Sequence, residues 1–177
     1  MSVIAAWRSL GFRIVPHTVA ALGIATAAGA TFACYMAAAD FLVFRDVIPA
    51  SMTSQLAHAS ALQRIAIFTP LAVIEDIVFR LLLLSIVAWA LVSIAGKHDW
   101  CYWAAILASA LIFYPIAHYS YLSGLQPSFA TVIREIMLHG GAGVLWGLLY
   151  WRYGLLAAMC GHVAAHIVLE PLMGLLV

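Results

Sequence analysis

Long apolar stretches alternate with short polar ones along the chain, and their lengths predict five membrane-spanning helices. Each stretch holds about the 20 apolar residues that a helix needs to cross a bilayer. We expect the spans near residues 17–39, 70–95, 101–122, 131–151 and 154–177. The loop between the last two is very short, so those two helices must be antiparallel neighbours. The pattern therefore predicts an all-α, polytopic helical membrane bundle.

The N-terminal segment, residues 1–15, does not continue this apolar pattern. Arg8 and Arg13 stand in otherwise apolar surroundings, so we expect the segment to lie at the membrane interface before the chain inserts. Arg13 and His17 also interrupt the apolar core that a cleavable signal peptide would need.

A second segment between the spans, residues 51–64, is more polar and predicts a short amphipathic helix on the membrane surface. After it, Thr69 is a candidate N-cap and Pro70 fits the first position of a helix. We therefore expect the second span to begin there and to run to Ala95.

Composition agrees with a protein that lives in a membrane. The 177 residues are 66% hydrophobic and only 8% charged, whereas soluble domains carry about 25% charged residues. A net charge of +1 without a basic block excludes the usual nucleic-acid-binding signature. We expect one integral, multi-pass domain over residues 1–177. Its three cysteines lack metal or disulfide spacing and are interpreted as packing residues.

Basic residues at the predicted span ends give a weak indication of orientation. On the side of the N-terminus lie Arg8, Arg13, Lys97 and Arg152. On the opposite side lie Arg45, Arg64 and Arg134. Four against three slightly favours a cytoplasmic N-terminus by the positive-inside rule.

The most informative stretch is Glu75-Asp76-x-x-x-Arg80, which puts three ionisable residues inside the second span. An isolated charge in hydrocarbon costs a few kcal/mol, so these side chains must face protein or water. Asp76 and Arg80 are four residues apart and can form an ion pair on one helix face, most simply a structural one. Glu75 points elsewhere and has no local partner, which makes it the candidate for chemistry.

Other polar side chains are predicted at a similar depth. With a rise of ~1.5 Å per residue, Glu75 lies roughly 8 Å inside its span and His118 about 6 Å from the end of the third. His166 and Glu170 lie on the same side of the fifth span, and His162 is nearer the midplane. Any one histidine is more often a hydrogen-bonded core residue, but ionisable groups from several helices are not expected to agree in depth by accident.

A buried carboxylate beside imidazoles suits one kind of chemistry in particular. Glu75 can act as a general base, a histidine can hold the water that it deprotonates, and further imidazoles can stabilise an oxyanion. No serine, threonine or cysteine stands in an obvious nucleophile setting. An activated water attacking an amide within the membrane is therefore the predicted reaction.

Three motifs in order carry a family resemblance: Glu75-Asp76-x-x-x-Arg80, Tyr114-x-x-x-His118 and His162-x-x-x-His166. Together, over roughly residues 66–170, they resemble the CAAX protease and bacteriocin-processing (CPBP, or Abi) family of intramembrane endopeptidases, which includes the Ras-converting CAAX prenyl proteases. The resemblance implies a helical bundle with a water-containing cavity open toward lipid. It also implies that Glu75 is the general base, that His118 positions water, and that His162 and His166 stabilise the oxyanion.

The chain departs from the family pattern at three positions. Asp76 replaces a second glutamate, Tyr114 replaces phenylalanine, and His166 replaces asparagine. The third matters most, because an asparagine amide is always a donor whereas histidine must have the right tautomer.

The sequence thus predicts a glutamate-dependent intramembrane endopeptidase without a cofactor, multi-pass in a bacterial cell membrane. Its substrate would be a membrane-associated peptide, either prenylated and CAAX-type or bacteriocin-related. A proton or metal-ion transporter and a catalytically idle scaffold or immunity protein are the alternatives, although no repeat of paired broken helices supports a transporter.

A metal site is the remaining possibility for the same residues. His162 and His166 have the spacing of a helical zinc-ligand pair, and Glu75 and His118 could complete the set. No intrahelical carboxylate is placed to orient His118 or His162 as a metal ligand requires. We therefore predict that no transition metal is bound.

Overall fold

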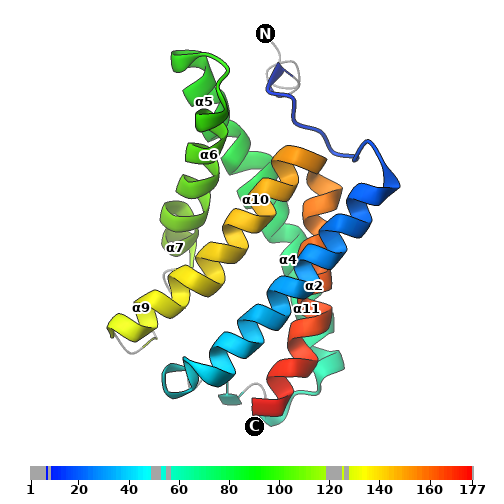
Figure 1. The fold of residues 1–177 in the computed structure, drawn as a ribbon, viewed down its shortest axis with the longest axis vertical. Helices are drawn as coiled ribbons and strands as arrows, with labels where there is room; N and C mark the ends of the chain where they lie inside the picture. The colour runs from blue at the N-terminus through cyan, green and yellow to red at the C-terminus, as the bar shows by residue number, and fades with distance from the viewer. Residues whose placement is uncertain are drawn as a thin grey trace.

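Five long helices pack into one bundle in this computed structural model (Figure 1). The structure describes residues 7, 9–48, 53–54, 57–118, 125 and 128–176, and these contain no strand. All five helices are long and apolar enough to cross a membrane, which confirms the predicted fold class. They are Val19–Leu42, Ala61–Ala95, Asp99–Ala117, Phe129–Tyr153 and Leu155–Met173. Figure 1 labels them α2, α4–α5, α6–α7, α9–α10 and α11.

The second spanning helix begins earlier than the sequence predicts. Its α4 portion (Ala61–Glu75) starts after Ser60, whose hydroxyl and backbone N–H form a capping box with Gln63. Pro70 lies inside the helix, so the predicted start at Thr69 and Pro70 is wrong. Transmembrane helices tolerate an internal proline because neighbouring groups satisfy the carbonyl that it leaves without a donor.

The predicted surface segment and the end of the third span are only partly visible. Residues 61–64 form the first turn of α4 and are not part of a surface helix. Residues 51, 52, 55 and 56, and residues 119–122 at the predicted end of the third span, lie outside the described residues.

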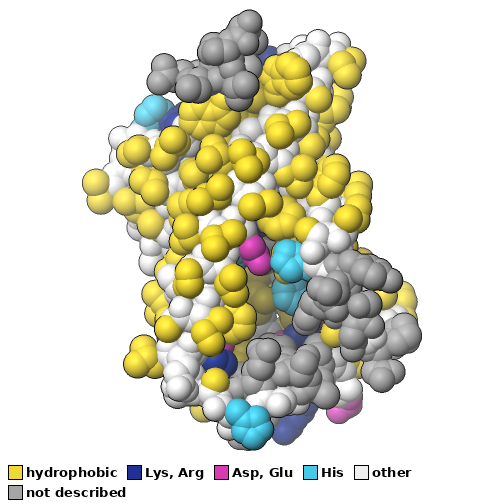
Figure 2. All heavy atoms as spheres, turned by 180° about the vertical axis from the view of Figure 1, so that it is seen from behind, with side chains coloured by type: hydrophobic (Ala, Val, Ile, Leu, Met, Phe, Trp, Pro, Cys, Tyr) yellow, Lys and Arg dark blue, Asp and Glu magenta, His cyan; other side chains and the backbone are white. Residues whose placement is uncertain are grey.

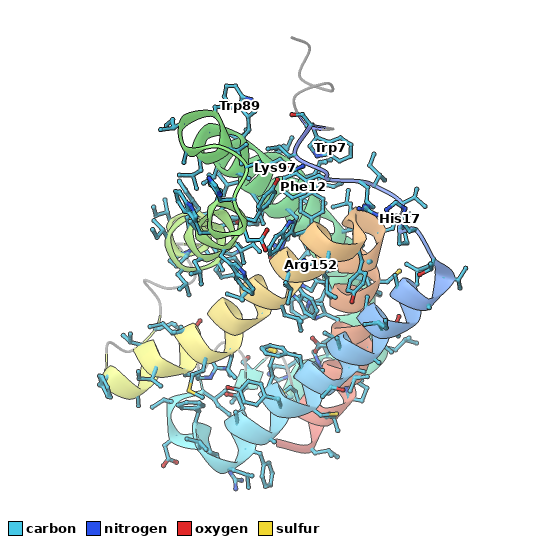
Figure 3. All side chains as sticks on the ribbon, turned by 45° about the horizontal axis from the view of Figure 1, so that its top comes forward. Trp7, Phe12, His17, Trp89, Lys97 and Arg152 are labelled. Carbon is cyan, nitrogen blue, oxygen red and sulfur yellow. The ribbon has the colours of Figure 1, made fainter. Side chains whose placement is uncertain are left out.

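Residues 9–15 pack across one end of the bundle, and the interfacial position that the sequence predicts for residues 1–15 stays a prediction. Leu10 and Phe12 are buried in the hydrophobic core, and Figure 3 shows Phe12 over that end of the bundle. The carbonyl oxygens of Arg13 and Ile14 each accept a hydrogen bond at 3.0 Å from the first two N–H groups of α11 (Leu155–Met173). The segment therefore caps a helix that has no side-chain cap of its own.

The end of the bundle opposite this segment carries few exposed cations. Arg64 and Arg134 lie inside spanning helices, with side chains 5% and 2% exposed, and each is ion-paired. Among the described residues, Arg45 is the one exposed cation at that end. At the other end, Lys97 and Arg152 (Figure 3) are exposed, and Arg13 is partly exposed. Three exposed or partly exposed cations among the described residues therefore lie at the end that carries the N-terminal segment, and one lies at the opposite end. This asymmetry is larger than the four against three that the sequence predicts.

Close helix contacts depend on small residues at two seams. Gly29 of α2 (Val19–Leu42) meets the backbone of Gly161 in α11. Gly143 and Gly147 of α10 (Gly141–Tyr153) pack against Ala110 and Ile106. Small residues let helix backbones approach in a membrane, where burial of apolar surface from water does not drive association.

Three of the spanning helices contain a π-helical segment, and each lies near the polar centre described below. They are η2 (Asp76–Leu84), η3 (Ser109–Phe113) and η4 (Ile136–Gly140). Two serine hydroxyls donate to carbonyls of η2: Ser109 to Phe79 at 3.1 Å and Ser85 to Arg80 at 3.3 Å. Such wide turns are frequent at functional sites, because they re-aim side chains along an otherwise regular helix.

Candidate active site

A cavity of about 480 Å³ lies in the half of the bundle away from the N-terminal segment. Its lining includes ten ionisable side chains: Asp40, Arg64, Glu75, Arg80, His118, Arg134, His139, His162, His166 and Glu170. Figure 2 shows acidic and histidine side chains gathered in a hollow on a face where many of the other described side chains are hydrophobic. The cavity thus joins polar chemistry to a surface suited to lipid.

The structure brings the predicted site residues together. Glu75, His118, His162 and His166 all line this cavity, as do Tyr114 and Arg80. Asp76 lies behind the lining and is fully buried. The shared depth predicted from helical rise therefore corresponds to a shared space, contributed by α4, η2, α7 (Tyr114–Ala117) and α11.

Glu75 and His118 form a direct pair across two helices. The Nε2 atom of His118 lies 3.3 Å from Oε1 of Glu75, and both side chains are about one-third exposed to the cavity (27% and 30%). The ring of Tyr114 stacks on His118 with centroids 4.0 Å apart. Glu75 has no partner on its own helix, as predicted, and its partner comes from the third span.

The hydrogen bonds of His118 define how many protons this pair holds. Its Nδ1 atom lies 3.1 Å from the carbonyl oxygen of Tyr114, which can only accept, so Nδ1 carries a hydrogen. The hydrogen bond between Nε2 and Glu75 then contains one proton, on either the imidazole or the carboxyl group. An ionised Glu75 with a protonated His118 is the form in which the glutamate can accept a proton from water.

His162 is backed by a buried acid and a buried arginine. Its Nδ1 atom lies 3.4 Å from Oδ2 of Asp76, and Oδ1 of Asp76 lies 3.3 Å from Nε of Arg80. Neither contact has hydrogen-bond alignment, since both Asp76 oxygens and His162 Nδ1 lack an aligned partner. Trp146 stacks on the His162 ring at 5.1 Å. The predicted Asp76–Arg80 ion pair is present, and it also faces His162.

His166 has a similar arrangement, with closer contacts. Its Nδ1 atom is hydrogen-bonded to Oε1 of Glu170 at 3.3 Å. The other oxygen of Glu170 accepts from Nε of Arg64 at 2.9 Å, and both side chains are less than one-tenth exposed. Phe68 stacks on the His166 ring at 5.4 Å and nearly parallel. Two histidines one turn apart on α11 therefore each face an acid that an arginine contacts, and of the two only His166 forms an aligned hydrogen bond with its acid.

A third buried cluster ties α2 to the fourth span beside the cavity. Arg134 donates two hydrogen bonds to Asp40, at 2.7 and 2.8 Å, and a third to Glu135 at 2.7 Å. Glu135 also contacts His139, 2.6 Å away. These contacts join α2 to the fourth spanning helix beside the cavity.

The sequence reasoning missed Arg64 and Asp40, both of which line the cavity. The predicted surface segment, residues 51–64, includes Arg64, whereas the capping box of Ser60 and Gln63 begins α4 before it and places Arg64 inside the helix. Once in the helix, Arg64 stands eleven residues before Glu75, about three turns, and so on nearly the same face. Asp40 gave no such signal, because its partner is 94 residues away in sequence.

The grouping of these side chains does not support a metal centre. Among the described residues, no cluster of three or more His, Cys, Asp or Glu side chains could hold a metal ion. The absence of a bound metal in the active protein stays a prediction.

Comparison with known proteins adds a family to this geometry. The model of the family described as "Type II CAAX prenyl endopeptidase Rce1-like" matches residues 57–168, more than half of the chain. No curated protein and no solved structure matches it. The matched range contains four residues that line the cavity: Glu75, His118, His162 and His166. The chain therefore belongs to the Rce1-like family of type II CAAX prenyl endopeptidases, and it is an intramembrane peptide hydrolase.

Proposed function

We propose that this protease is glutamate-dependent and that Glu75 activates the attacking water. The contact between Glu75 and His118 at 3.3 Å, open to the polar cavity, is the observation that carries the proposal. A carboxylate that keeps access to water and a partner for its proton can act as a general base.

The reaction follows from the positions of the side chains. Glu75 takes a proton from a cavity water while the oxygen of that water attacks the scissile carbonyl carbon. His118, fixed by the carbonyl of Tyr114, orients Glu75 and the water. His162 lines the same cavity and donates its Nε2 hydrogen to the oxyanion of the tetrahedral intermediate. Asp76 and Arg80 position His162, and Asp76, which is fully buried, does not touch the substrate.

The proposed substrate is a peptide held at the membrane, prenylated and CAAX-type or bacteriocin-related. The hydrophobic face around the hollow supports this, because a lipid-anchored peptide can enter from the bilayer (Figure 2). A smaller, mostly apolar cavity of about 150 Å³ adjoins the site at Tyr114 and His139 and adds to that apolar access. A bacterial cell membrane is the proposed location.

Replacement of Glu75 by glutamine tests the proposal. The amide fills the same space and can donate to Nε2 of His118, but it cannot take a proton from water. We expect a loss of cleavage of about 10²- to 10⁴-fold, the usual contribution of a general base. The assay follows an S-farnesylated CAAX-type peptide and a non-prenylated membrane-anchored peptide in vesicles containing the purified protein.

The matched control is Asp46→Asn, the same chemical change in an exposed turn at the same end of the bundle. It should cleave like the wild-type protein, and both variants should unfold at wild-type temperatures. A Glu75→Gln protein with near-normal cleavage would exclude Glu75 as the base. Cleavage of the non-prenylated peptide alone would exclude the prenylated substrate class.

A further inference from the structure

We propose that His166, oriented by Glu170 and Arg64, is the acid that protonates the leaving amine, a role different from oxyanion stabilisation. This inference rests on the proposed function, because it assigns one more step of the same hydrolysis. It concerns the position at which this chain has a histidine in place of the family's asparagine.

The hydrogen bonds around Glu170 fix which nitrogen of His166 carries a hydrogen. Arg64 donates through Nε to Oε2 of Glu170 and through Nη2 to its backbone carbonyl, at 2.9 and 2.6 Å. A carboxylate held by a guanidinium is ionised and can only accept. The hydrogen bond from His166 to Oε1 therefore requires a hydrogen on Nδ1.

That tautomer limits what His166 can do in the cavity. When the imidazole is neutral and Nδ1 carries the hydrogen, Nε2 has only a lone pair and cannot stabilise an oxyanion. When the ring is protonated, Nε2 carries a hydrogen that it can give away. A carboxylate behind Nδ1 stabilises the protonated ring, so the arrangement suits a group that donates a proton and later recovers it.

The surroundings of the two neighbouring imidazoles assign them different roles. Their rings stack at 5.3 Å, which disfavours a positive charge on both. His166 is the more exposed to the cavity, 21% against 9% for His162, and its hydrogen bond to the acid is aligned. His162 lacks that aligned bond, so its tautomer is not fixed by Asp76. The charged form therefore belongs to His166 and the neutral donor to His162.

The step balances without any further reactant. Water adds to the carbonyl carbon, its proton goes to Glu75, and the tetrahedral intermediate carries one negative oxygen. As the carbon–nitrogen bond breaks, nitrogen takes the Nε2 proton of His166, which releases a free amine and a carboxylic acid. The proton on Glu75 then returns to His166 through cavity water, and both groups are restored.

Leaving groups of different basicity separate this role from a structural one. A peptide amine needs a proton to leave, whereas the nitrophenolate of an activated ester does not. His166→Asn keeps a neutral donor but cannot carry an exchangeable ring proton. We expect it to lose about 10²- to 10⁴-fold on the peptide, as for a general acid, and less than about 10-fold on the 4-nitrophenyl ester of the same acyl group.

Two further variants complete the design. Glu170→Gln should show the same selective loss on the peptide, while Glu75→Gln should lose activity on both substrates, because water attack is needed for each. His98→Asn, an exposed residue at the far end of the bundle, is the matched control and should match the wild-type protein. Equal losses on peptide and ester in His166→Asn, or no loss on the peptide, would overturn the proposal.

A spectroscopic measurement tests the arrangement independently of any substrate. In ¹⁵N-histidine-labelled protein, Nδ1 of His166 should carry a hydrogen in both the neutral and the protonated ring, with exchange confined to Nε2. The groups that face this ring are Glu170, Arg64 and His162, with Glu75 across the cavity. A neutral His166 with its hydrogen on Nε2 would refute the inference, even if the glutamate-dependent hydrolysis is correct.

Discussion

The contact between α2 and α11 gives a sharp prediction about how closely helix packing controls this site. A Cβ atom added to Gly29 would lie 1.9 Å from the carbonyl oxygen of Gly161 and 2.7 Å from its carbonyl carbon. Both atoms belong to the backbone, so no side-chain rotation relieves the overlap. Since ordinary contacts begin near 3.4 Å, Gly29→Ala requires a local separation of about 1.5 Å, that is 3.4 minus 1.9.

This separation must change the cavity, whichever helix moves. His162 follows Gly161 directly, and His166 lies one turn further along α11. On the other side, α2 contributes Met36 and Asp40 to the cavity. A misplacement of about 1 Å can lower a catalytic rate about 10²-fold. Overpacking lowers the free energy of unfolding by about 1–3 kcal/mol. Replacing a helical glycine by alanine raises it by about 1 kcal/mol, which offsets part of that loss.

We therefore expect Gly29→Ala to lose more activity than its stability explains. Gly23→Ala is the matched control in the same helix, because a Cβ atom there meets nothing within 4 Å. That control should be as active as the wild-type protein and slightly more stable. Peptide cleavage in vesicles and unfolding in detergent provide the two measurements. Gly29→Ala activity within about threefold of the control would refute the argument that backbone spacing at this seam positions the α11 histidines.

Two other properties can be predicted. Purified protein should hold no stoichiometric transition metal and should remain active after exhaustive chelation. Zinc bound at one equivalent would contradict this if its removal abolishes activity and its return restores it. The asymmetry of exposed cations predicts a cytoplasmic N-terminal end. A cysteine at Asp46 should then react with an impermeant maleimide in intact cells, and one at His98 only after permeabilisation, with the reverse pattern contradicting this orientation.

Much of the fold and of the candidate site was predictable because both depend on local signals. Apolar length identified five spans, and the cost of charge in lipid drew attention to Glu75 and to the histidines. Helical rise then predicted that these residues share a depth, since it converts sequence position into distance along an axis. Their meeting in one cavity follows from the antiparallel order of the helices.

The features that could not be predicted depend on long-range contacts or on irregular backbone. The burial of Phe12 depends on stacking against Tyr150, 4.8 Å away by ring centroids, and no local pattern contains that contact. The partners of Arg64 and Arg134 likewise come from distant helices. The π-helical segments leave no trace in hydrophobic periodicity, because the residues there are as apolar as those of regular turns.

The adjacent acids of the second span show why similar residues at one site need not share a role. Successive residues on a helix point about 100° apart, so Glu75 and Asp76 face different neighbours. Glu75 faces the cavity and His118, where partial exposure leaves room for water. Asp76, with no exposure, is enclosed by Arg80 and His162. A base must reach water and an orienting group need not, so helical geometry supports the proposed base role for Glu75 and the proposed positioning role for Asp76.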